Sequence, residues 1–176
     1  GGIFSSIAFK DLNGGHLYVD AWENKPPGIF YLIEFFMIVI PDPVYAVFIL
    51  SLLALSGLSL LVYTFIFQST QSLIASLSLS FIGIAIIVFK SNCGDGLYTE
   101  IYGTICLVAA LVAYKKYQLN NRISLINLSF GLLGLSFWFK EPFGLIAIAT
   151  FVYLLYTSDR KRNWLYAILF FSLPSL

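Results

Sequence analysis

The chain has 176 residues, of which 59% are apolar, 18% are aromatic and only 11% carry charge. Soluble domains carry about 25% charged residues, so this composition excludes an ordinary soluble domain. The formal net charge of +1 offers no electrostatic basis for binding nucleic acid. Cys93 lies in a polar segment and Cys106 in an apolar run, so neither a disulfide nor a cysteine metal framework is indicated.

A series of apolar runs predicts an all-α fold, a polytopic transmembrane helical bundle. The predicted spans are 44–67, 72–89, 101–114, 123–139 and 142–156, followed by the start of a sixth at 163–176. The chain begins with Gly1, shows no signal peptide and ends inside an apolar run. We therefore expect residues 1–176 to be a single transmembrane domain fragment of a longer protein.

Residues 28–40 differ from the spans because they are too short to cross a bilayer. This segment carries Glu34 and stops at Pro41-Asp42-Pro43. It is therefore predicted to be an interfacial helix that does not cross. Residues 1–43 then form a first external loop, followed by about five transmembrane helices and the truncated sixth.

Charge separates the two faces that this topology defines. One face receives 1–43, 90–100 and 140–142, and the other receives 68–71, 115–122 and 157–162. The first face holds Lys10, Lys25, Lys90 and Lys140 against Asp11, Asp20, Glu23, Glu34, Asp42, Asp95, Glu100 and Glu141. The second holds Lys115, Lys116, Arg122, Arg160, Lys161 and Arg162 against Asp159 alone. Short basic loops stay in the cytoplasm, so the acidic face is predicted to be external.

The first loop contains the most distinctive sequence, AFKDLNGGHLYVDAWENKPPGIFYL at 8–32. Asn13-Gly14-Gly15 predicts a turn, and Tyr18-Val19-Asp20 a short extended segment. Lys25-Pro26-Pro27 predicts an extended backbone that leads into a helix, because proline restricts the residue before it and suits the first helical position. Lys25 is either a snorkelling membrane anchor or a contact for a lipid phosphate.

This stretch resembles the first external loop of the C-type fold glycosyltransferases. The resemblance is closest to the bacterial branch of the dolichyl-phosphate-mannose–protein mannosyltransferase-like family, which includes aminoarabinose transferases. The matching residues are Gly14-Gly15, Tyr18-Val19-Asp20, Trp22, Asn24 and Lys25-Pro26-Pro27. Gly96-Leu97-Tyr98-Thr99-Glu100 resembles the acidic second external loop of these proteins, and Phe139-Lys140-Glu141-Pro142 is a weaker match between two short helices.

The resemblance implies inverting transfer of a sugar from a polyprenyl-phosphate donor to an acceptor on the external face of a bacterial inner or plasma membrane. The catalytic aspartate of the family would fall just before Gly1, so this chain alone is expected to be inactive. Lys25 and Lys140 are the candidates for the donor phosphate, and Tyr18 and Asp20 of the first-loop motif are further candidate substrate-binding residues.

The resemblance also makes Glu100 and Asp95 candidates for orienting the acceptor or a cation. No organic cofactor is expected, and a divalent cation is left open. His16 is the single histidine, which excludes a multi-histidine metal site in this chain. The expected partners are the lipid-linked sugar donor and membrane lipid.

Two other interpretations stay open. A transporter or flippase for a lipid-linked substrate would fit the helix break at Lys140-Glu141-Pro142. Transporters place ionisable groups near mid-membrane, however, whereas the charges here gather in loops. A non-catalytic membrane assembly protein that only resembles the family would lack the upstream aspartate.

Overall fold

The computed structural model describes residues 2–20, 25–90 and 99–157. In these residues the chain forms seven α-helices and no β-strand, so the predicted all-α membrane fold is confirmed. The helices are α1 Gly2–Leu12, α2 Gly28–Val39, α3 Pro43–Thr70, α4 Leu73–Lys90, α5 Thr99–Asn120, α6 Ile123–Ser136 and α7 Pro142–Thr157. The sixth predicted span, 163–176, lies outside the described residues.

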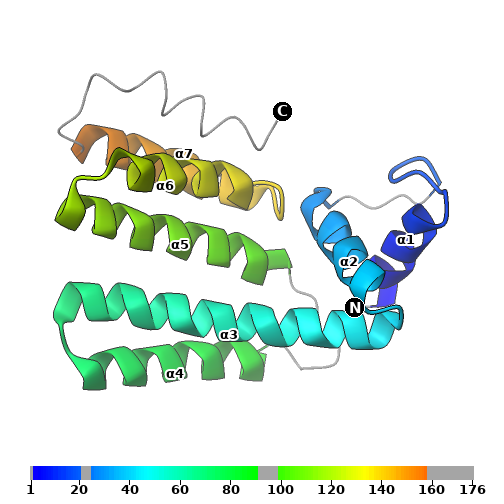
Figure 1. Cartoon of the computed structure of the whole chain (residues 1–176), viewed down its shortest axis with the longest axis horizontal. Helices are drawn as coiled ribbons and strands as arrows, with labels where there is room; N and C mark the ends of the chain where they lie inside the picture. Colours follow the sequence, from blue (N-terminus) through cyan, green and yellow to red (C-terminus); the bar gives the residue numbers. More distant parts are fainter. Residues whose placement is uncertain (1, 21–24, 91–98, 158–176) are drawn as a thin grey trace.

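The helices α3 to α7 lie side by side, and α1 and α2 stand at the end where α3 begins (Figure 1). Helix α5 packs on α3 and on α6, while α4 lies on the other side of α3. Of the described helices, α3 alone is long and apolar enough to cross a bilayer, with 28 residues and a mean hydropathy of 2.3. The shorter apolar segments are Gly28–Val39, Leu73–Ile86, Ile123–Ser136 and Pro142–Leu154.

Local signals set the ends of α3. Asp42 precedes the helix, and its carboxylate accepts hydrogen bonds from the N–H groups of Val44 (2.8 Å) and Tyr45 (3.2 Å). These bonds satisfy N–H groups that have no partner within the helix, and Pro43 suits the first helical position. Gln71 ends the helix in the left-handed conformation (φ 54°), as Asn121 does after α5 (φ 52°). Both ends therefore reverse the chain within two residues.

Helix α1 was not predicted, because residues 1–43 were expected to be loop apart from the interfacial helix. The helix forms because Ile7 and Ala8, 8% and 0% exposed, pack into one core cluster with Ile29 and Phe30 of α2. Apolar burial at this junction supplies the stabilisation that a helix of 11 residues lacks on its own. The first loop thus contains two helices, α1 and α2, that pack on each other.

The turn in the first loop is partly as predicted. Gly14 (φ 89°) and the N–H groups of Gly14 and Gly15 close the turn onto the carbonyls of Asp11 and Lys10, each at 3.0 Å. The extended segment expected at Tyr18-Val19-Asp20 is wrong. The backbone turns there, with Tyr18 at φ 66° and two N–H groups donating to the His16 carbonyl. The physical reason is that this turn lets Asp20 bond back to His16 and Lys10.

The predicted loop at 115–122 is also mostly wrong, because α5 continues to Asn120. Tyr114 and Tyr117 are buried, and they belong to the core cluster that α5 shares with α6 and α7. This packing carries the helix past the basic residues Lys115 and Lys116. The helix predicted at 28–40 forms as α2, and the break predicted at 140–142 lies in the connection between α6 and α7. The interfacial position of α2 stays a prediction.

Candidate functional site

The candidate site lies at the end of the molecule where α1, α2, the start of α5 and the α6–α7 connection meet (Figure 1). A core cluster underlies this end and includes Phe30 of α2, Ala46 of α3, Tyr102 of α5 and Phe139 of the connection. The Tyr102 and Phe139 rings stack with centroids 5.6 Å apart. This buried cluster supports the end of the molecule that holds the predicted site residues, which are Tyr18, Asp20, Lys25, Glu100 and Lys140.

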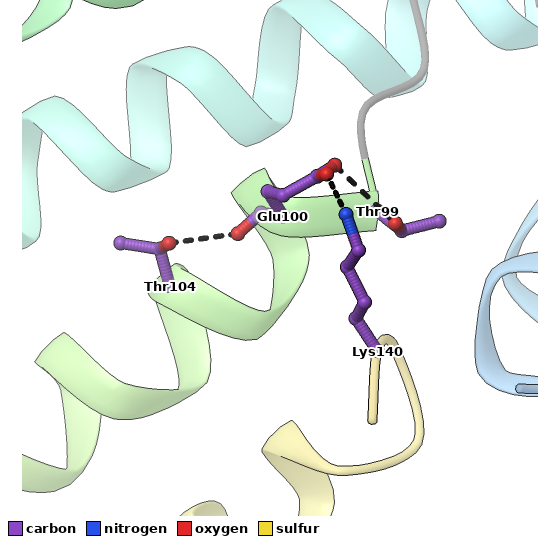
Figure 2. A network of polar contacts seen from close by, with 4 residues as sticks. All are labelled: Thr99, Glu100, Thr104 and Lys140. Carbon is purple, nitrogen blue, oxygen red and sulfur yellow. Dashed lines mark hydrogen bonds and ion pairs between the residues drawn. The ribbon is translucent and has the colours of Figure 1, made fainter. Parts of the chain in front are cut away.

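Glu100 and Lys140 form an ion pair across 40 positions of sequence, between the first turn of α5 and the connection before α7. Figure 2 shows the Lys140 side chain reaching to the carboxylate, whose other oxygen accepts a hydrogen bond from the Thr99 hydroxyl at 3.3 Å. The two side chains are 26% and 47% exposed, for Lys140 and Glu100 respectively. Such a partly exposed pair contributes about 1 kcal/mol or less to stability.

The charge of Glu100 is maintained by its partners. Glu100 lies just outside the predicted membrane span, which begins at Ile101. Burial raises the pKa of Glu100, but the hydrogen bond from Lys140, a backbone hydrogen bond and the positive charge of Lys140 outweigh it and hold the pKa below its usual value. The pair is therefore ionised at neutral pH and carries no net charge.

The start of α2 is fastened to the same connection. The N–H of Gly28 donates a hydrogen bond to the carbonyl of Trp138 at 3.0 Å. The approach is so close that a Cβ at position 28 would lie 2.6 Å from this oxygen. Glycine is therefore needed at position 28. The segment Lys25-Pro26-Pro27 immediately precedes Gly28, so its C-terminal end is held beside Trp138.

Tyr18 holds the other side of the Lys25 segment. Its hydroxyl donates to the Lys25 carbonyl at 2.5 Å, and its ring meets Phe30 edge-on with centroids 6.4 Å apart. Burial, with smaller contributions from Tyr31 and the charge of Glu141, raises the pKa of Tyr18. The phenol thus stays neutral and remains a hydrogen-bond donor to the backbone at Lys25.

Asp20 is engaged within the first loop. Its carboxylate accepts a hydrogen bond from the His16 N–H at 2.8 Å, and its carbonyl accepts one from the Lys10 ammonium at 2.6 Å. The observed contacts of Asp20 therefore close the turn that follows α1. A contact between Asp20 and substrate stays a prediction.

The three lysines Lys10, Lys25 and Lys140, whose side chains the structure describes at this end, differ in their partners. Lys10 donates to the Asp20 carbonyl, and Lys140 is paired with Glu100. Within residues 2–20, 25–90 and 99–157, the Lys25 ammonium takes part in no ion pair. Lys25 is half-buried at the entrance of α2, with its backbone held from both sides. Lys25 thus differs from Lys140, whose ammonium is paired with the Glu100 carboxylate.

A second carboxyl group at this end was not singled out from the sequence. Glu34 of α2 faces Asp11 of α1, and the Glu34 Oε1 atom is buried with no hydrogen-bond partner among the described residues. Burial, followed by the hydrogen bond with Asp11 and the charge of Asp11, raises the pKa of Glu34 to about 7. Asp11 also accepts a hydrogen bond from the Leu17 N–H at 3.0 Å, so the pair lies where α1, α2 and the turn meet.

Other predicted features lie outside this geometry. Asp95, Trp22 and Asn24 fall outside the described residues, so a joint role for Asp95 and Glu100 stays a prediction. Among the described residues, no group of three or more His, Cys, Asp or Glu side chains could hold a metal ion. Sequence analysis also missed Gly28 and Trp138, although a glycine that follows Pro26-Pro27 at a helix start is a usable signal of close approach.

A groove of about 660 Å³ lies elsewhere, between α3 and α4. It is open and mainly apolar, and its polar groups are the hydroxyls of Ser56, Ser59, Tyr63 and Ser80. It contains no charged side chain, so it offers no group for acid–base chemistry or for neutralising a phosphate.

Comparison with known families matches residues 24–175 to the family model described as dolichyl-phosphate-mannose-protein mannosyltransferase. The match includes Lys25, Glu100 and Lys140, and it begins after Tyr18 and Asp20. No curated protein and no solved structure matches the chain. The family is one of integral membrane glycosyltransferases of the C type, which agrees with the all-α membrane fold. Since the match covers most of its length, the chain belongs to the dolichyl-phosphate-mannose-protein mannosyltransferase family.

Proposed function

We propose that this protein is a multi-pass glycosyltransferase of a bacterial inner or plasma membrane. It transfers a sugar from a polyprenyl-phosphate donor to an acceptor on the external face of that membrane. The observation that carries the proposal is the state of Lys25. Its backbone is held by Tyr18 and, through Gly28, by Trp138, while its ammonium has no ion-pair partner among the described residues. In this proposal, Lys25 binds the phosphate of the donor.

The chemistry requires little else from this part of the chain. The acceptor hydroxyl attacks the anomeric carbon and gives its proton to a carboxylate base, while the bond between that carbon and the phosphate oxygen breaks. The leaving phosphate keeps the electron pair and gains negative charge, which a fixed lysine stabilises. The carboxylate base is the aspartate that the family resemblance implies just before Gly1.

Location at the membrane surface supports the same assignment. Lys25 lies three residues before Gly28, where α2 starts. We interpret α2 as an interfacial helix, and in this proposal the Lys25 ammonium lies at the level of the lipid headgroups. A polyprenyl phosphate presents its charged group at that depth while its chain remains in the bilayer.

The test is sugar transfer by the membrane-inserted full-length protein with Lys25→Ala. We expect transfer from the polyprenyl-phosphate sugar to fall about 100-fold, as when one fixed group that stabilises the leaving charge is removed, with unchanged expression. Lys116→Ala is the matched control, because Lys116 is an exposed lysine near the opposite end of α5. Normal transfer by Lys25→Ala would remove Lys25 from the donor site.

A further inference from the structure

Two contacts connect the start of α5 to the start of α2 through the α6–α7 connection. Glu100 of α5 pairs with Lys140 of the connection, and the Trp138 carbonyl of the same connection accepts the N–H of Gly28. Lys25 lies three residues before Gly28 in the sequence. The path from Glu100 to Lys25 is thus continuous, although the two residues belong to segments far apart in the sequence.

The α6–α7 connection, which contains both Trp138 and Lys140, is held in place by hydrogen bonds and ring stacking. The N–H groups of Phe137, Trp138 and Phe139 donate to the carbonyls of Gly134, Leu135 and Ser136, so α6 passes into a tight turn. Phe139 is 8% exposed and stacks on Tyr102, two residues after Glu100. A displacement of Lys140 must therefore move the Trp138 carbonyl or strain this turn.

Electrostatics argue against Lys140 as a direct phosphate contact. Its ammonium is neutralised by the Glu100 carboxylate, and a phosphate approaching Lys140 would also meet that negative charge. Lys25, in contrast, is in no ion pair among the described residues. Lys25 and Lys140 therefore have different roles, and only Lys25 is proposed to contact the phosphate.

We propose that Glu100 and Lys140 are positioning residues, whose ion pair holds the α6–α7 connection in the place where the Trp138 carbonyl fixes the start of α2 and hence the Lys25 segment. This inference rests on the proposed function, in which Lys25 binds the donor phosphate. It assigns neither Glu100 nor Lys140 to contact with the donor or acceptor. A small displacement of a binding group lowers activity strongly even where the pair that holds it adds little stability.

The test uses charge exchange in the full-length protein. Glu100→Gln and Lys140→Met each break the pair, and the double variant with Glu100→Lys and Lys140→Glu restores it with reversed polarity. We expect each single change to raise KM for the polyprenyl-phosphate sugar about ten-fold with a smaller change in kcat, and the double variant to return KM to within about two-fold. Lys116→Met is the control for loss of a lysine.

A second readout is independent of activity. Hydrogen–deuterium exchange of the peptide that covers the first turn of α2 reports the Gly28 N–H bond to Trp138. Exchange is expected to become faster in both single variants and slow again in the double variant. A merely stabilising pair would change exchange throughout the protein and would not select this peptide.

Two results would overturn the inference and separate it from the proposed function. If Lys25→Ala is inactive but the double variant binds donor as poorly as Lys140→Met, with exchange of α2 unchanged in all variants, Lys140 contacts the donor itself. The proposed function then stands and the positioning role fails. If Lys25→Ala transfers sugar normally, the donor site is misplaced and both fail.

Discussion

The ionisation of Glu34 depends on the folded structure. Its pKa rises from 4.5 to about 7 because the carboxyl is partly buried and faces Asp11. A raised pKa means that the folded state binds this proton more tightly than the unfolded state. The resulting stabilisation is fully present below pH 4.5 and is lost as the pH rises through about 7.

The corresponding prediction is that Glu34→Gln removes this pH dependence. Glutamine keeps the shape of the protonated carboxyl and cannot ionise, so the unfavourable charge beside Asp11 is absent at high pH. The wild-type protein should have a lower Tm at pH 8 than at pH 5, and Glu34→Gln should reduce that difference by raising the Tm at pH 8. Glu141→Gln, at an exposed acid of the same end, is the control. An unchanged difference in Glu34→Gln would contradict the effect assigned to Asp11.

Single residues also show what sequence could and could not predict about the site. Lys25 at the helix entrance was predictable, because two prolines restrict the backbone locally. The topology placed Glu100 and Lys140 on one face, but their pairing over 40 positions has no local signal. The hydrogen bonds of Tyr18 and Asp20 depend on the three-dimensional path of the first loop. Their residue types alone suit a binding site and a turn equally well.

Among the secondary-structure elements, the docking of α2 on the α6–α7 connection gives the sharpest prediction. Gly28→Ala would bring a Cβ within 2.6 Å of the Trp138 carbonyl, a backbone atom that cannot move aside cheaply. We expect a loss of about 1–3 kcal/mol in the free energy of unfolding, as for overpacking. Gly57→Ala is the matched control, because a Cβ at position 57 of α3 would meet no atom within 4 Å. Thermal unfolding of both variants checks the difference, and equal Tm values would contradict the assigned contact.

Helix positions were predictable to the extent that local chemistry marks their ends. The pairs Pro26-Pro27 and Pro41-Asp42 bracket α2, and the helix appears between them as Gly28–Val39. Helix α1 has no such markers, and its stability comes from Ile7 and Ala8 meeting α2. The end of α5 was misplaced for the same reason, because Tyr117 is held by a partner helix. Periodicity and end signals are local, whereas these two features are tertiary.

For the whole molecule, the central prediction concerns which end faces the cytoplasm. The connections after α3 and α5 lie at one end of the bundle, and α1, α2, the start of α5 and the α6–α7 connection lie at the other (Figure 1). The positive-inside rule then places the end with Lys115, Lys116 and Arg122 in the cytoplasm. A topology reporter fused after Arg122 or after Arg162 should read as cytoplasmic, and one after Glu141 as external. An external result after Arg122 would overturn the orientation and the external site with it.

The two-residue connections at Gln71-Ser72 and Asn121-Arg122 bear on how the chain is assembled during synthesis. With so short a link, α4 must lie against α3, and α6 against α5, as soon as each second helix leaves the ribosome. The Ser129 hydroxyl of α6 then finds the Ala110 carbonyl of α5 at 2.8 Å without waiting for any later segment. We therefore expect each hairpin to insert into the membrane as a unit, and removing a whole hairpin should disturb its neighbours less than removing one of its two helices.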